Sequence, residues 1–415
     1  MSHILIVGKK FSSLTQHIVA NGNDYTFLQD ILTTKFPDKK FKHRVLADFS
    51  SKQSVLATVD SLAVQPDAVI ATYENYILPA SWIAEHLNLP GIPVSAAEAC
   101  TDKFIMRSLF DNAPEKISPA FATVASEAEL REFASSHDFP LILKPANLAK
   151  SLLVTKNHNL EELLVNYEKS VDLLATTYKK YAPNRQPKLI IEEFLQGSIH
   201  SVDAFVDATG TPYVLNEVVD YQTGFDIGYD DNFHYSRILP SKLSDDDQRQ
   251  LRHCAEVGIR ALGMKSCPAH VEIIMTPAGP RIVEIGARNG GYRERMHMIA
   301  NGIDITGIAL QVAIGQAFNV SATKNDPCAV LELFPKTPGN FTGIKNQTQL
   351  ESLDSLNYLS VKAKINTFTG KSADGYKMAA VIILHNPSEA QFEKDLQYVN
   401  ENVWAETTPT LDSKS

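Results

Sequence analysis

The fold is decided by the stretch His270-Val271-Glu272-Ile273-Ile274-Met275-Thr276-Pro277-Ala278-Gly279-Pro280-Arg281-Ile282-Val283-Glu284-Ile285-Gly286-Ala287-Arg288. It reads as two short apolar strands joined by a turn rich in Pro and Gly. We take Thr276 to Pro280 as the loop, so that Met275 pairs with Arg281. Counting back along the strands places Glu272 opposite Glu284. Because side chains alternate along a strand, both carboxylates share one face of the hairpin.

Two glutamates in this arrangement need a positive partner between them. The Cβ atoms of directly opposed residues lie about 4.5–5.5 Å apart, and like charges there destabilise a sheet. Two carboxylates with Arg288 four residues on indicate Mg²⁺ that carries phosphates. The alternative is a solvated hairpin whose glutamates face water, but the flanking residues are almost all apolar.

Composition narrows the class of protein. A length of 415 residues favours roughly two to three domains. The net charge of −9 argues against a nucleic-acid surface, so we expect no nucleic-acid partner. The four cysteines form no CxxC pair, which predicts free thiols in a reducing compartment instead of a zinc site or a disulfide framework.

Apolar runs are short throughout the chain. The run from Ile4 to Val7 has no basic segment before it and is too short for a signal peptide. The longest run, Met378 to Leu384, is far shorter than a membrane span. We therefore predict a cytoplasmic protein with no membrane partner.

Strands and helices alternate over the first hundred residues, which predicts a small open parallel sheet. We expect strands at 4–7 and 67–71 and a helix at 78–87. The segment Gly8-Lys9-Lys10 does not match G-x-G-x-x-G, so a dinucleotide-binding Rossmann domain is disfavoured.

The rest of the chain divides into a mixed region and a β-rich end. We expect one helix over 97–110, with a possible cap at Thr101, and a polar and aromatic loop over 220–234. Further strands are expected at 139–145, 189–193, 201–206 and 212–219, and helices at 160–175, 244–262 and 305–318. From about residue 329, short strands at 330–334, 361–365 and 378–384 precede a helix at 389–400, and the last dozen residues are predicted to be disordered.

Four segments in this order resemble the ATP-grasp superfamily of carboxylate–amine ligases: Asp102-Lys103, Leu143-Lys144-Pro145, 191–197 and 272–291. The resemblance covers roughly residues 1–320. Within the superfamily, the sequence most resembles L-amino-acid ligases (dipeptide synthetases) and biotin-carboxylase-like enzymes. It implies an α/β ATP-grasp fold with an N-terminal Rossmann-like pre-ATP-grasp domain and a small β-rich C-terminal subdomain. The implied boundaries are 1–112, 113–320 with a lid subdomain at about 137–206, and 321–415.

The resemblance assigns the nucleotide and metal residues. Lys103 and Lys144 match the lysines that hold ATP phosphates, although either could be a surface lysine. The hinge that binds adenine is matched by Glu192, Glu193, Phe194 and Leu195, and the alternative is an edge strand with two solvated glutamates. Glu272 and Glu284 match the ligands of Mg²⁺ or Mn²⁺. Arg288 matches the arginine that steadies the transferring phosphoryl group.

Three departures from the family pattern stand out. The lid segment 145–151 contains no glycine, although Lys150 and Ser151 could still cover the phosphates. The acidic ribose ligand is absent near Ile199, and His200 is its candidate substitute. The usual Glu-x-Asn metal pattern reads Glu284-Ile285-Gly286, so a water or a phosphate oxygen would fill one ligand position.

The sequence leaves alternatives open for the substrate residues. Arg293 and Arg295 could hold a substrate carboxylate, or one of them could be a surface arginine paired with Glu294. Asp226 and His234 could shape the substrate pocket, or belong to a solvated loop. His270 shares the carboxylate face, but a packed histidine behind the glutamates is favoured over a ligand.

The resemblance implies an ATP-dependent ligase that joins a small carboxylate, expected to be an amino acid, to an amine through an acyl phosphate, with release of ADP and phosphate. A biotin-carboxylase-like or purine-pathway enzyme and a catalytically inactive ATP-binding regulatory protein are the alternatives. The expected partners are small-molecule carboxylate and amine substrates, with a homodimer as a further possibility. Substrate identity, pathway and oligomeric state stay open.

Overall fold

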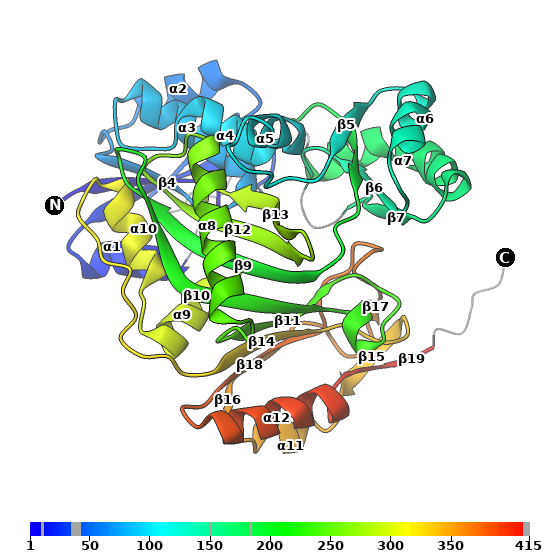
Figure 1. Cartoon of the computed structure of the whole chain (residues 1–415). Coiled ribbons are helices and arrows are strands. Elements are labelled where there is room, and N and C mark those ends of the chain that lie inside the picture. The colour runs from blue at the N-terminus through cyan, green and yellow to red at the C-terminus, as the bar shows by residue number, and fades with distance from the viewer. Residues whose placement is uncertain (10–11, 35–42, 149–151, 183–184, 410–415) are drawn as a thin grey trace.

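The computed structural model describes residues 1–409 except 10–11, 35–42, 149–151 and 183–184 (Figure 1). The N-terminal part is a four-stranded parallel sheet with the order β3-β2-β1-β4. Residues Ile4–Val7 of the central strand are fully buried, which explains their unbroken apolar run. The predicted parallel sheet is confirmed. Its elements are β1 (His3–Val7), α1 (Ser12–Ala20), β2 (Asp24–Asp30), β3 (Arg44–Ala47), α2 (Lys52–Asp60), β4 (Ala68–Ala71), η1 (Glu74–Tyr76) and α3 (Ile77–His86).

The helix predicted over 97–110 is two helices, α4 (Val94–Thr101) and α5 (Lys103–Phe110). Asp102 separates them with an extended backbone, and its carboxylate accepts hydrogen bonds from the backbone N–H groups of Phe104 and Ile105. The cap is therefore Asp102 and not Thr101, since a carboxylate satisfies free N–H groups at a helix start. This places Lys103 in the first turn of α5 and Arg107 one turn later on the same face.

An eight-stranded sheet with the order β13-β12-β9-β10-β11-β14-β18-β16 forms the centre of the molecule. The helix α8 (Asp245–Ala261) covers one face through a core that includes Ala204 and Val206, while α10 (Ile305–Ala313) packs on the other face with Phe205. This alternation along one strand is the expected burial pattern of a sheet covered on both faces. The strands here are β9 (Ser198–Val206), β10 (Pro212–Thr223), β11 (His234–Leu239), β12 (Cys267–Thr276) and β13 (Gly279–Gly286).

The C-terminal region is β-rich, as predicted, but it continues the central sheet. The strands β14 (Cys328–Leu333), β18 (Ala380–His385) and β16 (Leu356–Val361) follow β11 edge to edge. The strand predicted at 361–365 is wrong, because β16 ends at Val361. The strands β15 (Gly339–Ile344), β17 (Phe368–Thr369) and β19 (Ala405–Thr408) form a separate small sheet, so part of the predicted disordered end is ordered. Two helices, α11 (Gln347–Glu351) and α12 (Glu389–Asn402), complete this region.

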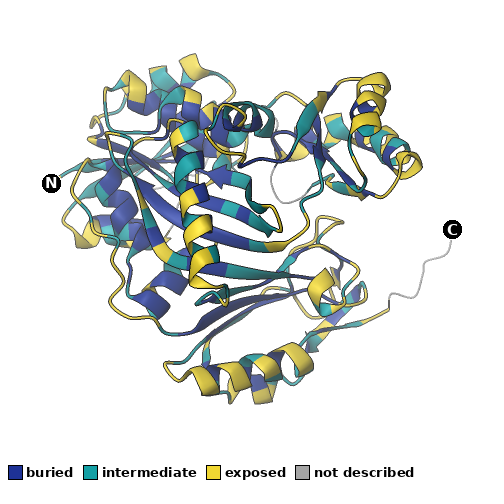
Figure 2. Ribbon diagram, in the orientation of Figure 1, coloured by how far each residue is buried: buried dark blue, intermediate teal, exposed yellow. Residues whose placement is uncertain are grey.

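A small antiparallel sheet with the order β5-β8-β6-β7 projects to one side, and we refer to this part, Phe121 to Glu193, as the lid (Figure 1). The lid subdomain predicted at about 137–206 also includes β9, which pairs within the central sheet. Figure 2 shows its strands buried and the outer faces of its helices exposed. The lid contains β5 (Phe121–Val124), α6 (Glu127–Ser136), β6 (Leu141–Pro145), β7 (Thr155–Asn157), α7 (Leu160–Tyr181) and β8 (Leu189–Glu193).

The cysteines are free thiols, as the composition predicted. All four cysteines are free and buried, and burial raises the pKa of the thiols of Cys254 and Cys328 to about 12. No helix in the described ranges is long and apolar enough to cross a membrane.

Candidate active site

The β12–β13 hairpin places Glu272 opposite Glu284, as predicted. The predicted five-residue loop is wrong, because Met275 pairs with Pro280 and only two residues separate Thr276 from its partner Gly279. A bulge between Glu272 and Ile273 leaves one extra residue, Val283, on β13 and restores the pairing of the glutamates. The two carboxylates therefore share one face for a different reason than the one expected.

Positive groups surround this carboxylate pair. The Lys103 Nζ lies 2.8 Å from Glu284 Oε2, and the His270 Nε2 lies 3.7 Å from Glu272 Oε1. Burial acts to raise the pKa of each glutamate, but these cations and Arg288 outweigh it and hold both pKa values below their ordinary range. Both carboxylates are therefore charged at neutral pH.

The charged pair fits a divalent cation that brings further oxygen ligands with it. Among the described residues, no three His, Cys, Asp or Glu side chains gather into a complete metal site. If Mg²⁺ binds here, Glu272 and Glu284 would supply its carboxylate ligands, and phosphate oxygens and water would supply the others.

Lys144 lies in the lid strand β6, where its Nζ is 2.5 Å from Glu192 Oε2 on β8. Arg107 from α5 contacts the other oxygen of the same carboxylate, with its Nε 3.0 Å from Glu192 Oε1. Burial is the main cause that lowers the pKa of Lys144 to about 8, while Glu192 acts in the opposite direction. Neither Lys144 nor Glu192 is a solvated surface residue, because 7% and 4% of their surfaces are exposed.

The predicted hinge, residues 192–195, connects the lid to the central sheet. The Glu193 carboxylate accepts a hydrogen bond from the Ala120 N–H at 2.8 Å, and the Phe194 N–H donates to the Pro140 carbonyl. The Lys156 ammonium lies 3.7 Å from the centre of the Phe194 ring. The segment is therefore held against the lid strands at the point where the chain leaves β8.

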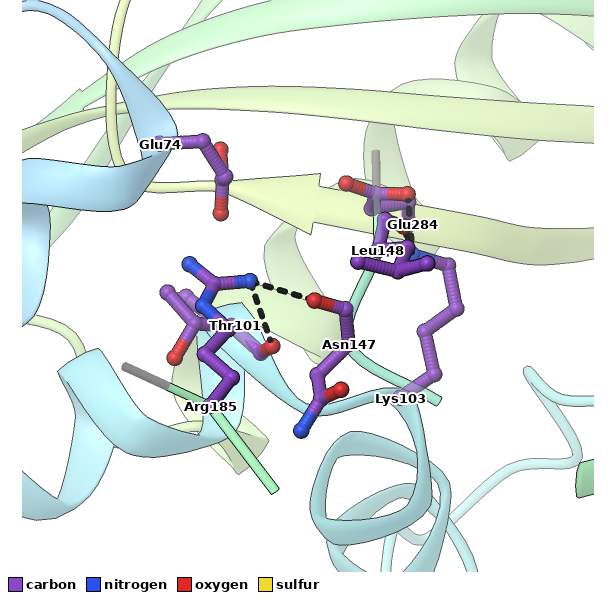
Figure 3. A pocket seen from close by; sticks show the side chains of 8 residues that line it. Glu74, Thr101, Lys103, Asn147, Leu148, Arg185 and Glu284 are labelled. Atoms are coloured by element: carbon purple, nitrogen blue, oxygen red, sulfur yellow. Dashed lines mark hydrogen bonds and ion pairs between the residues drawn. The ribbon is translucent and has the colours of Figure 1, made fainter. Parts of the chain in front are cut away.

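A small cavity lies where the N-terminal region, the lid and the hairpin meet (Figure 3). It is lined by Glu74, Cys100, Thr101, Lys103, Asn147, Leu148, Arg185 and Glu284. Arg185 NH1 donates to the backbone carbonyl oxygens of Asn147 at 2.7 Å and Thr101 at 3.4 Å. Figure 3 shows the Glu74 carboxylate and the Arg185 guanidinium directed toward the same space.

Glu74 is a site residue that the sequence did not single out. Its Oε2 lies 3.1 Å from Arg288 Nε, while its buried Oε1 has no hydrogen-bond partner among the described residues. Burial raises the pKa of Glu74, and the nearby Glu284 adds to this effect. Glu74 follows the parallel strand β4, and the carboxyl ends of such strands are where open α/β sheets bind ligands. The position of Glu74 after a predicted parallel strand could therefore have marked it as a candidate site residue.

Residues 137–294 match the ATP-grasp domain family. This part of the chain is an ATP-grasp domain. An alanine–anticapsin ligase of Bacillus subtilis is 28% identical over 289 residues, which cover 65% of this chain and 60% of that relative. Three such curated ligases are matched over 53–62% of their own length, so the chain spans less than two thirds of each.

Solved structures of ATP-grasp proteins share the fold over nearly the whole chain. The L-amino acid ligase of Bacillus licheniformis has a TM-score of 0.79 at 17% identity and covers 98% of this chain and 99% of its own. The phosphoribosylglycinamide synthetase of Anaerococcus prevotii has a TM-score of 0.68 at 18% identity, with coverage of 98% and 100%. The predicted ATP-grasp fold is confirmed.

Behind the hairpin of the ATP-grasp domain, two histidines and an arginine surround the buried Asp203 carboxylate. His270 Nδ1 donates to it at 2.7 Å, His297 Nε2 at 3.3 Å, and Arg293 Nε lies 3.3 Å away. His270 therefore stands between Asp203 and Glu272 as a packed residue that orients the glutamate, which is the alternative favoured from sequence.

Both predicted substrate arginines contact other parts of the protein. Arg293 is fully buried, and its NH2 donates to Ser201 Oγ at 2.8 Å and Tyr221 Oη at 2.7 Å. Arg295 lies over the Tyr358 ring at 4.3 Å. The helix α9 (Arg293–Asn301), which was not predicted, places the first arginine in the core and the second beside β16. Their role in substrate binding stays a prediction.

The other predicted residues are placed as follows. His200 is buried, its Nδ1 donates to Asp220 at 2.8 Å, and Ser198 Oγ lies 2.6 Å from its Nε2, so both ring nitrogens are engaged within the protein. Asp226 is exposed and accepts bonds from the Thr223 N–H and hydroxyl, which makes it a turn residue. His234 packs edge-on against Tyr221 at 4.8 Å, and burial lowers its pKa. Lys150 and Ser151 lie outside the described residues.

Proposed function

We propose that this ATP-grasp protein is an ADP-forming ligase that joins an amino acid or another small carboxylate to an amine. The observation that carries the proposal is the meeting of Lys103, Glu284 and Glu74 around one cavity, with Arg288 bound to Glu74. This arrangement offers cations for phosphates, carboxylates for a metal ion and a free carboxylate oxygen for a substrate amine.

The proposed chemistry has two steps. A substrate carboxylate oxygen attacks the γ-phosphorus of ATP, so that one P–O bond forms, the bond to the β-phosphate oxygen breaks, and ADP leaves. The amine nitrogen then attacks the acyl carbon, the C–O bond to phosphate breaks, and the amine loses a proton as the amide forms. Neither step needs a protein nucleophile, so catalysis comes from orientation and charge neutralisation.

Each charged group has a defined task in this scheme. Lys103 and Lys144 neutralise ATP phosphates, and Arg288 binds the oxygens of the acyl phosphate with its planar guanidinium. Glu272 and Glu284 would hold Mg²⁺ or Mn²⁺, which neutralises phosphate charge when bound. The lid closes over the cavity and excludes water, which would otherwise hydrolyse the acyl phosphate.

Glu74 supports an amino acid as a substrate. Its free Oε1 is a hydrogen-bond acceptor in a buried setting, and an ammonium group there would satisfy it and lower its desolvation cost. The alanine–anticapsin ligase and L-amino acid ligase among the similar proteins also favour an amino acid. A homodimer and a cytoplasmic location stay predictions.

The test is release of ADP and phosphate from Mg-ATP with the twenty amino acids, singly and in pairs, with mass detection of products. Release that depends on an amino acid, together with a new amide mass, is the expected result. Release that depends on bicarbonate, formate or a purine-pathway amine would replace the amino-acid assignment. ATP binding without turnover on any of these substrates would favour the regulatory alternative.

A further inference from the structure

Arg107 is a fully buried arginine outside the set of phosphate and metal residues. It comes from α5, one helical turn after Lys103, so both side chains leave the same face of the helix. The Nε of Arg107 lies 3.0 Å from Glu192 Oε1, and its NH2 donates to the Val283 carbonyl at 2.8 Å. An arginine buried this deeply must gain enough from its partners to offset the loss of water.

The contacts of Arg107 join three parts of the site. Glu192 lies in the lid strand β8 and holds Lys144, while Val283 directly precedes Glu284 on β13. The same helix carries Lys103, which binds Glu284 at 2.8 Å. The helix α5 therefore fixes the phosphate lysine of the lid and the carboxylates of the hairpin relative to each other.

Charge gives Arg107 a second role. A Lys144–Glu192 pair alone is neutral and would attract a phosphate weakly. Because Arg107 takes one oxygen of Glu192 and Lys144 takes the other, the three groups together carry one net positive charge. A fixed net charge in a buried site acts on a polyanion much more strongly than it would in water.

We propose that Arg107 is a positioning residue of the ATP site: it holds the Glu192 carboxylate so that Lys144 presents its charge to the phosphates in register with the Glu284 strand. The inference rests on ATP use in the proposed function and requires no amide formation. It assigns to Arg107 an effect on nucleotide binding that packing alone would not produce.

The test compares Arg107→Met with Phe110→Leu, a change in the same helix that removes buried packing without touching Glu192. Direct titration with Mg-ATP should show a dissociation constant raised about 10- to 100-fold in Arg107→Met, since a hydrogen bond to a charged group is lost. Phe110→Leu should bind ATP like the wild type once corrected for folded fraction. Equal binding by both variants would overturn the proposal.

If Arg107→Met does not fold, Arg107→Lys tests the same proposal. Lysine keeps the charge but cannot bridge the Glu192 carboxylate and the Val283 carbonyl as a planar fork does, so partial rescue of ATP binding is expected. Wild-type binding by Arg107→Lys would refute the bridge. In a Glu192→Gln background, Arg107→Met should add little further loss, whereas additive losses would show that Arg107 does not act through Glu192.

The pH dependence of ATP binding supplies a readout that packing does not move. Lys144 is faced by Glu192 from β8 and by Arg107 and Lys103 from α5. Wild-type affinity should fall as pH rises through about 8, and Arg107→Met should shift this fall to higher pH, because a repelling cation is gone. An unshifted profile contradicts the proposal. If the wild type does not bind ATP, both the proposed ligase function and the role of Arg107 are refuted. If it binds ATP but forms no amide, only the ligase function is refuted.

Discussion

The side chains of Glu74 and Glu192 are 11% and 5% exposed and both lie beside an arginine, yet their pKa values shift in opposite directions. Arg107 and Lys144 each contact one oxygen of Glu192 and, against the effect of burial, lower its pKa to about 2. Arg288 contacts one oxygen of Glu74 and the other oxygen has no partner in the described chain, so burial prevails and raises the pKa.

The difference distinguishes a carboxylate whose two oxygens are bound within the protein from a carboxylate with one oxygen left to bind a ligand. A buried charge is stable only when its partners repay the lost hydration. Glu192 has both oxygens engaged and therefore holds the lid to α5. Glu74 is incompletely satisfied, and a cationic group in the cavity would complete it, which is the reason we assign it to a substrate amine.

Glu284 is a third glutamate that can be compared with Glu74 and Glu192. The substitution Glu284→Gln should have the largest effect. The present partner of Glu284 is Lys103, and the proposed ligand is a metal ion, so loss of the charge should abolish Mg²⁺-dependent turnover, by about 10³-fold or more. The far-ultraviolet circular dichroism spectrum and the unfolding midpoint should stay close to those of the wild type. Full activity in this variant would refute the metal assignment.

Glu192→Gln should instead reduce stability. It leaves Arg107 and Lys144 as buried cations without a counter-charge, which costs about 3–5 kcal/mol of unfolding free energy. Glu127→Gln is the matched control, because Glu127 forms an exposed pair with Arg131 at 2.7 Å and should change stability by less than about 1 kcal/mol. Urea unfolding of both variants measures the difference. Equal midpoints would mean that the buried cluster does not hold the lid.

The hairpin and the phosphate lysines could be predicted from sequence because their signals are local. Apolar alternation, the Pro/Gly turn and the apolar residues before Lys144 each lie within a few positions of the residue they predict. Even there, the bulge at Val283 was invisible, and the correct register came from two errors that cancelled.

Contacts between distant segments could not be predicted in this way. Arg107 meets Glu192 across 85 positions, and Arg288 meets Glu74 across 214 positions. No periodicity encodes such pairs, so the buried contacts of Arg293 with Ser201 and Tyr221 could not be predicted either. The continuity of β14, β18 and β16 with the central sheet has the same cause, since sheet order depends on partners far apart in sequence.

Glu74→Gln is expected to act on the substrate and hardly on the fold. The amide loses the charge that would bind an ammonium group, so the KM for the amino acid should rise about 10- to 100-fold with a smaller change in the KM for ATP. Glu85→Gln, in the exposed Lys52 pair of the same region, is the control and should leave both constants unchanged. A rise in the KM for ATP alone would move Glu74 from the amine to the nucleotide.

The smallest expected effect is on the pH dependence of stability, where the two glutamates should give opposite slopes. Glu192 has a folded-state pKa of about 2, below the unfolded value, so its contribution is present above pH 4.5 and is lost as pH falls toward 2. Glu74 has a raised pKa, so its contribution is present below the unfolded value and is lost as pH rises through the folded value. Relative to the wild type, Glu74→Gln should therefore gain stability as pH rises above about 4.5, whereas the deficit of Glu192→Gln should shrink as pH falls below it. Unfolding midpoints measured from pH 3 to pH 7 give both slopes, and slopes of the same sign would mean that the free oxygen of Glu74 is satisfied in solution.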